Sequence, residues 1–185
     1  MIDLSAGAPE ARRRWRKGAR HAALRALRTG VRVREAQGAG DWRRFAEVYR
    51  QCVAGWERPL AVYRPELFDI LASRTEDGAH LWLAEVDGAP TAGAVVFRHG
   101  AYATWWLGAS LRSHPPGAMN ALQWELVGQL AAEGCRVYDL NGSAGLAGVV
   151  AFKEHIGGAA TPVLAVERRH PLQGVARRAL GRPRR

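Results

Sequence analysis

The sequence predicts a single α/β domain in which helices flank a mixed, mostly antiparallel central sheet. Its 185 residues suffice for one domain with a real hydrophobic core. Hydrophobic residues make up 48% and charged residues 24%, a balance that excludes a wholly disordered chain. From residue 31 onward, the hydrophobic periodicity predicts the element order β-α-α-β-β-β-α-β-α-β.

The first third of the chain shows helical spacing of its apolar residues. Residues 9–29 are predicted to form one arginine-rich helix, with Trp15 and several alanines along one face. A short strand follows at 31–34. Asp41 is a candidate cap for the next helix, and Pro65 suits the first turn of a further helix that ends near residue 77.

The middle of the chain changes to the strand repeat. Three strands are predicted at residues 81–86, 91–97 and 102–107, and the glycine-containing pairs Asp87-Gly88 and His99-Gly100 separate them. Turns this short join antiparallel neighbours, so we expect an antiparallel meander.

The last third is predicted to alternate again. The expected elements are a helix at 117–132, a strand at 135–140, a small-residue loop at 141–145, a helix that ends near residue 157, a strand at 162–166, a basic helix at 171–180 and a disordered end at 181–185.

Positive charge is concentrated at the two ends. Residues 1–34 carry a net charge of +8 and residues 168–185 a net charge of +7, whereas the residues between them carry −5. We therefore divide the chain into a basic N-terminal helix (1–30), a domain (31–168) and a basic tail (169–185). Such ends suit a polyanion such as nucleic acid, an anionic membrane surface or a phosphate-bearing substrate. A solvated arginine-rich face is the alternative.

Other sequence features restrict the class of protein. Cys52 and Cys135 are too few for a disulfide framework, so we expect reduced thiols. Early arginines argue against a signal peptide, and no apolar run is long enough to span a membrane. We expect a cytoplasmic protein. The histidines show no metal-ligand spacing, so no metal site is predicted.

Three segments together resemble the FemABX-like aminoacyltransferase family, whose members have the N-acetyltransferase (GNAT) fold. They are Leu122-Gln123-Trp124-Glu125, Tyr138-Asp139-Leu140-Asn141-Gly142 and Phe152-Lys153-Glu154-His155-Ile156-Gly157. The chain departs from the family pattern at Leu140 and Ile156, where the family has aromatic residues. The resemblance implies a GNAT-like domain over nearly all of residues 31–167, in which the fourth and fifth strands of that domain separate to admit an acyl donor.

The resemblance also implies a reaction and a set of site residues. Members of the family take an aminoacyl group from a charged tRNA and form an amide on an amine. Lys153 is then expected near the start of a helix, at the acyl donor, because the attack builds an oxyanion that needs a positioned hydrogen-bond donor. Asp139 is expected to accept or orient a proton, or else to hold the loop. The predicted donor-binding residues are Phe152, which can stack on the terminal adenosine, and Tyr138, Asn141, Gly142 and Ser143.

The remaining predicted contacts concern the acceptor and the RNA. Trp105 and Trp106 are adjacent on a strand and face opposite sides, and with Trp124 they are the candidate acceptor-binding residues. The acceptor itself is expected to be a small peptide or a cell-wall precursor. The candidate RNA-binding residues are Arg12, Arg13, Arg16, Lys17 and Arg20.

Two other functions stay open. The first is an N-acetyltransferase that uses acetyl-CoA. The segment Arg112-Ser113-His114-Pro115-Pro116-Gly117-Ala118 disfavours it, because its spacing is wrong for a pyrophosphate loop and its prolines lack N–H donors. The second is a non-catalytic RNA-binding module. Family members carry two tandem domains, so a homodimer is one way in which this single domain obtains the missing half. No resident cofactor is predicted.

Overall fold

A computed structural model describes residues 1–55, 62–111 and 116–162 of the chain. The strands within these residues are β1 (Ile2–Asp3), β2 (Arg32–Glu35), β3 (Ala79–Val86), β4 (Ala89–His99), β5 (Tyr102–Ser110) and β6 (Val137–Asp139). The helices are α1 (Gly7–Arg13), α2 (Lys17–Arg28), α3 (Ala39–Ala54), α4 (Pro65–Ala72), α5 (Ala118–Ala132) and α6 (Ala147–His155). The strands form one sheet in the order β1-β6-β5-β4-β3-β2.

The sheet is mixed and mostly antiparallel, as predicted. Strands β2 to β5 pair with their neighbours in antiparallel fashion, which confirms the meander. Asp87 and Gly88, between β3 and β4, both have positive φ, the conformation of a tight hairpin turn. Only the pair β5–β6 is parallel among the described strands, and β1 closes that edge antiparallel to β6.

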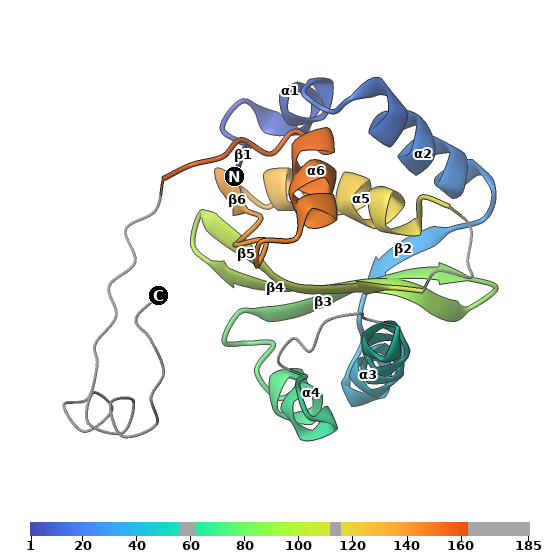
Figure 1. Cartoon of the computed structure of the whole chain (residues 1–185). Coiled ribbons are helices and arrows are strands. Elements are labelled where there is room, and N and C mark those ends of the chain that lie inside the picture. The colour runs from blue at the N-terminus through green and yellow to red at the C-terminus, as the bar shows by residue number, and fades with distance from the viewer. Residues whose placement is uncertain (56–61, 112–115, 163–185) are drawn as a thin grey trace, which may run out of the picture.

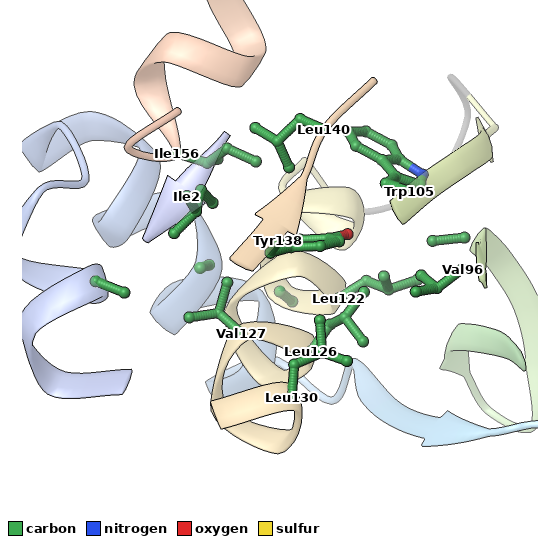
Figure 2. Close-up of a cluster of buried hydrophobic side chains, with 14 of the residues drawn as sticks. Ile2, Val96, Trp105, Leu122, Leu126, Val127, Leu130, Tyr138, Leu140 and Ile156 are labelled. Atoms are coloured by element: carbon green, nitrogen blue, oxygen red, sulfur yellow. The ribbon is translucent and has the colours of Figure 1, made fainter. Parts of the chain in front are cut away.

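Helices cover both faces of the sheet and create two hydrophobic clusters (Figure 1). Helices α1, α2, α5 and α6 lie on one face, and α3 and α4 lie on the other. Figure 2 shows the first cluster, in which Leu122, Leu126 and Leu130 of α5 are buried together with Val96 and Tyr138. These leucines recur at every fourth residue, so they lie on one side of α5.

The predicted single helix at residues 9–29 is instead two helices, because the chain breaks between Arg13 and Lys17. Trp15 lies in the break, is buried, and packs edge-on against Trp124 with ring centroids 5.1 Å apart. The amide of Arg16 donates to the carbonyl oxygen of His155 at 2.9 Å. Burial of this tryptophan and a hydrogen bond to α6 therefore replace the helical hydrogen bonds that the periodicity predicted.

Several expected ends of elements also differ. Helix α3 begins at Ala39 after Gly38, so Asp41 is not its cap and instead lies inside the first turn. Helix α4 begins at Pro65 as predicted but ends at Ala72. Strand β1 was not predicted, because two paired residues are too short for a periodic signal. The predicted elements at 162–166, 171–180 and 181–185 lie outside the described residues, apart from residue 162.

Candidate functional site

The two parallel strands pair over three residues and then separate. The pairs run from Tyr102–Val137 to Thr104–Asp139, where β6 ends, whereas β5 continues to Ser110. Against its other neighbour, β5 has one extra residue at Trp106, since Val96 pairs with Trp105 and Val95 with Leu107. A β-bulge of this kind bends its strand. It lies two residues beyond the last β5–β6 pair, so it turns β5 away at the point of separation.

A cavity of about 340 Å³ lies beside the separated part of β5. Its lining includes Trp105 and Trp106 of β5 together with Phe152 and Lys153 of α6. Met119 of α5 and Cys52 of α3 also line it, although these helices cover opposite faces of the sheet. Residues from both helical layers thus border one space, which we call the cleft.

Lys153 borders the cleft from the last turn of α6, and not from the start of a helix as expected. Its Nζ donates to the carbonyl oxygens of Asn141 at 3.1 Å and Gly142 at 2.8 Å, and it lies 5.8 Å from the ring centroid of Trp105. Burial lowers the pKa of this ammonium, and the charge of Asp139 partly offsets the effect. An ammonium has three N–H groups, and acceptors within the described residues take two of them, which leaves one for a ligand.

Asp139 holds the turn at the end of β6. Its carboxylate accepts hydrogen bonds from the Tyr102 hydroxyl and from the Asn141 amide, both at 2.8 Å. Asn141 has a φ of +60°, a left-handed conformation that asparagine tolerates, and its side-chain oxygen accepts from the Gly142 amide. The amides of Asn141 and Gly142 are therefore bonded to the side chains of Asp139 and Asn141.

A second cavity of about 330 Å³ lies on the other side of Lys153. It shares Leu140, Gly142 and Lys153 with the cleft. Asn141 and Ser143 line it, so the predicted donor-binding loop borders this second space with its side chains and the cleft through Gly142. Asp139 and Glu154 place two carboxylates at the second cavity, beside the ammonium groups of Lys153 and Met1, whereas the lining of the cleft contains no carboxylate.

The aromatic residues divide between the two faces of the sheet. Phe152 meets Trp105 with ring centroids 6.1 Å apart, and the Trp105 indole N–H donates to the carbonyl oxygen of Leu107 at 3.0 Å. Trp106 faces the α3–α4 side, where it packs against Tyr63 at 4.8 Å and Phe97 at 5.5 Å between ring centroids. Both tryptophans nevertheless line the cleft.

Two of the predicted site residues lie elsewhere. Tyr138 is fully buried and donates its hydroxyl to Gln123 Oε1 at 2.9 Å, and burial raises its pKa far above the ordinary value. Trp124 packs against Trp15, and the Arg12 guanidinium lies 4.5 Å from its ring centroid. Neither residue lines the cleft or the second cavity, so both are placed to support the fold around α5.

The predicted RNA-binding residues fall into two groups. Arg12 is half-buried and donates to the carbonyl oxygen of Trp124, and Arg13 forms an ion pair with Glu10. Arg16 and Lys17 are exposed and Arg20 is partly exposed, and none of the three has an acidic partner within the described part of the chain.

Sequence reasoning missed several residues that line the cleft. Met119 and Cys52 lie outside the sequence motifs. The first half of α6 is recognisable only in the structure, where Ala147, Gly148, Val149 and Val150 are apolar or small and yet none of them is buried. An apolar helix without a buried face is one that borders a cavity or another surface.

Comparison with protein families decides the class of the chain. Residues 9–154 match a family model described as an acetyltransferase (GNAT) domain. The chain belongs to the GNAT family. This confirms the expected fold class, and the cleft lies beside the part of β5 that has separated from β6, where the fold was expected to admit an acyl donor. The chain is a GNAT acyltransferase domain.

Solved structures of GNAT proteins resemble this chain at low sequence identity. FemX has a TM-score of 0.70 and 14% identity over 84% of this chain and 57% of its own. A ribosomal-protein-alanine N-acetyltransferase from Brucella melitensis biovar Abortus 2308 has a TM-score of 0.61 and 15% identity over 76% of this chain and 99% of its own. The C-terminal domain of a protein assigned as a lysylphosphatidylglycerol synthetase from Agrobacterium fabrum has a TM-score of 0.57 and 18% identity. This match covers 76% of this chain and 44% of the other.

These likenesses show a shared fold. The chain spans little more than half of the FemX chain and less than half of the Agrobacterium chain. A comparison with curated protein sequences gave no match. In the described residues, no helix is long and apolar enough to cross a membrane, and no three His, Cys, Asp or Glu side chains gather as a metal site would require.

Proposed function

We propose that this GNAT domain transfers an aminoacyl group from aminoacyl-tRNA to an amine and so forms an amide. The observation that supports the proposal most is Lys153, whose half-buried ammonium borders the cleft at the point where β5 and β6 separate. Its position agrees with the FemABX-like motif that contains it, and the FemX structure shares the fold over 84% of this chain.

The proposed reaction has one bond made and one broken. The neutral amine nitrogen attacks the ester carbonyl carbon, a C–N bond forms, and the carbonyl oxygen gains negative charge. The C–O bond to the terminal ribose then breaks, and the proton of the amine passes to the ribose oxygen. Lys153 has one N–H free to donate to the carbonyl oxygen where charge develops. Helix α6 has no side-chain cap, and Leu146 and Gly148 at its start line the cleft, so its positive end favours a negatively charged group of the donor at that end of the cleft.

The cleft also provides binding surface for two substrates. Phe152 and Trp105 offer aromatic faces on the α5–α6 side, where the terminal adenosine stacks. Trp106 borders the cleft on the α3–α4 side, where the acceptor approaches. The acceptor class, a small peptide or a cell-wall precursor, and the homodimer stay predictions.

Transfer of label tests the donor directly. A panel of tRNAs charged with radiolabelled amino acids, and labelled acetyl-CoA in parallel, is incubated with the protein and with simple amines and short peptides, with and without RNase. We expect label to move to an amine from a charged tRNA only while the RNA is intact. Label that moves from acetyl-CoA and is unaffected by RNase would instead identify an N-acetyltransferase. If no label moves from either donor, the remaining function is that of a non-catalytic RNA-binding module.

A substitution tests the role of Lys153. Lys153→Met retains most of the side-chain volume and removes the donor, so we expect kcat/KM for transfer to fall by about 100- to 1000-fold, the usual cost of one lost oxyanion donor. Arg50→Met on α3 removes a charge from an exposed ion pair and is the matched control. Equal rates for the two variants would contradict the role of Lys153.

A further inference from the structure

Helix α2 carries a row of basic side chains on its outer face. Lys17, His21, Arg25 and Arg28 are all exposed and follow one another at spacings of four, four and three residues, so they lie on one side of the helix. Ala19, Ala23 and Ala26 on the opposite side are buried. A cavity of about 490 Å³ borders the row and is lined in part by His21, Arg25 and Arg28. We call the four residues the α2 basic row.

The α2 basic row is unfavourable for the helix that bears it. Arg25 and Arg28 are three residues apart and repel one another, and Lys17 lies at the positive end of the helix dipole, although the two arginines in the last turn interact favourably with its negative end. The first turn of α2 contains no acidic residue, and no acidic side chain of the described residues pairs with the row. A ligand with regularly spaced negative charges would remove this repulsion, which makes a polyanion the matching partner.

The α2 basic row lies beside the donor side of the cleft. A side chain at Gly117 would place its Cβ 2.6 Å from the carbonyl oxygen of Ala22, so α2 directly contacts the residue that precedes α5. Met119, two residues further on, lines the cleft. The hydrogen bond from Arg16 to His155 connects the start of α2 to the end of α6. Figure 1 shows α2, α5 and α6 on the same face of the sheet.

We propose that the α2 basic row binds the sugar–phosphate backbone of the RNA whose aminoacylated end enters the cleft. This inference rests on the proposed function. It assigns the RNA contact to Lys17, Arg25 and Arg28, with His21 as a further hydrogen-bond donor, and not to Arg12 and Arg13, which have partners within the fold. An anionic membrane is the weaker match, because helices that lie on membranes insert an apolar face, whereas the buried side of α2 packs against α5.

Binding of uncharged tRNA tests the α2 basic row apart from any transfer chemistry. The test variant is Lys17→Gln/Arg25→Gln/Arg28→Gln, and the control is Arg43→Gln/Arg50→Gln/Arg74→Gln. The control removes the same charge from exposed positions on and near α3 and α4, on the other face. Binding of labelled tRNA is measured by fluorescence anisotropy between 50 and 200 mM salt, and circular dichroism checks that both variants are folded.

We expect the test variant to bind tRNA on the order of 100-fold more weakly near 0.1 M salt, with the slope of log affinity against log salt reduced by about 2 to 3. The control should keep the wild-type slope. Equal losses in both variants would overturn the inference. It would also fail if the test variant kept its affinity for tRNA and lost binding to vesicles of phosphatidylglycerol and phosphatidylethanolamine.

A short donor separates this inference from the proposed function. With an aminoacylated oligonucleotide that consists only of the CCA end, the test variant should transfer at the wild-type rate, because the backbone contact is absent from both reactions. If transfer requires intact tRNA but does not respond to the triple substitution, only the proposed RNA-binding role of the α2 basic row is overturned. Tight tRNA binding without transfer from any charged tRNA would overturn the proposed function alone.

Discussion

The arginines on the two sides of this sheet have different surroundings. On the α3 side, Arg34 of β2 donates to both oxygens of Asp41 and to both oxygens of Glu85, at 2.5 to 2.9 Å. Arg44 approaches the same two carboxylates at 3.3 Å. On the other side, the α2 basic row forms no ion pair with a carboxylate within the described residues. Arg34 and Arg44 are thus paired with carboxylates, whereas the α2 basic row is exposed to solvent.

The difference indicates which charges stabilise the fold and which are available to a ligand. Asp41 and Glu85 have side chains only 11% exposed, so they require compensating charge, and Arg34 supplies it with the planar geometry that suits two carboxylates. The α2 basic row is exposed and can lose charge at little cost to the fold. Substitutions on the α3 side should therefore affect stability, and substitutions in the α2 basic row should affect ligand binding.

Removal of Arg34 should have the largest effect on stability. Arg34→Met leaves two mostly buried carboxylates facing Arg44 alone, so we expect the free energy of unfolding in urea to fall by about 3 kcal/mol. Arg50→Met, which breaks an exposed ion pair with Glu47, should cost less than about 0.5 kcal/mol. If Arg34→Met lowered the free energy of unfolding as little as Arg50→Met does, the Arg34 ion pairs would not be what stabilises the α3 side.

The pH dependence of the same variant has a definite sign. Hydrogen bonds from Arg34 hold the pKa of Asp41 well below its usual range. A carboxylate with a lowered folded-state pKa stabilises the protein fully above its unfolded pKa of about 3.9, and this contribution is lost as the pH falls through the folded-state pKa. The stability difference between wild type and Arg34→Met should thus be full at pH 7 and smaller at pH 3. Urea unfolding at both pH values measures it, and a difference that grows toward pH 3 would contradict this cause.

Most of the fold could be predicted from local pattern, and the exceptions have identifiable physical causes. The meander, α5 and the helix start at Pro65 follow from alternation, helical spacing and turn residues. The break at Trp15 could not be predicted, because it depends on a distant partner, Trp124, and on a hydrogen bond to His155. Asp41 was expected as a cap because sequence alone does not reveal that Arg34 lies across from it.

The candidate site was predicted in part, since its motif residues are close in sequence and its other residues are not. Lys153, Phe152 and Gly142 do border the cleft. The expectation of the lysine near a helix start was wrong, because α6 begins at Ala147, close to the end of the loop predicted at 141–145, and Lys153 lies in its last turn. Met119 and Cys52 come from helices that only the tertiary structure brings to the cleft.

The smallest expected effect concerns Asp139, the last residue of β6, which anchors the loop whose carbonyl groups Lys153 binds. Both of its oxygens already accept hydrogen bonds, from Tyr102 and Asn141, so we expect it to position the loop and not to take a proton. Asp139→Asn keeps an acceptor for the Asn141 amide, and the new amide group can donate to the Tyr102 oxygen. Transfer should therefore fall less than about tenfold, with the pH profile of kcat/KM unchanged.

Asp139→Ala provides the contrast that makes this prediction decisive. Alanine removes both hydrogen bonds, so the loop that holds Asn141 and Gly142 loses its anchor and the carbonyl oxygens bound by Lys153 shift. We expect a larger loss of kcat/KM than in Asp139→Asn, since about 1 kcal/mol is typical for each such bond. If Asp139→Asn instead loses as much activity as Lys153→Met, and the acidic limb of its pH profile disappears, then Asp139 is the proton acceptor.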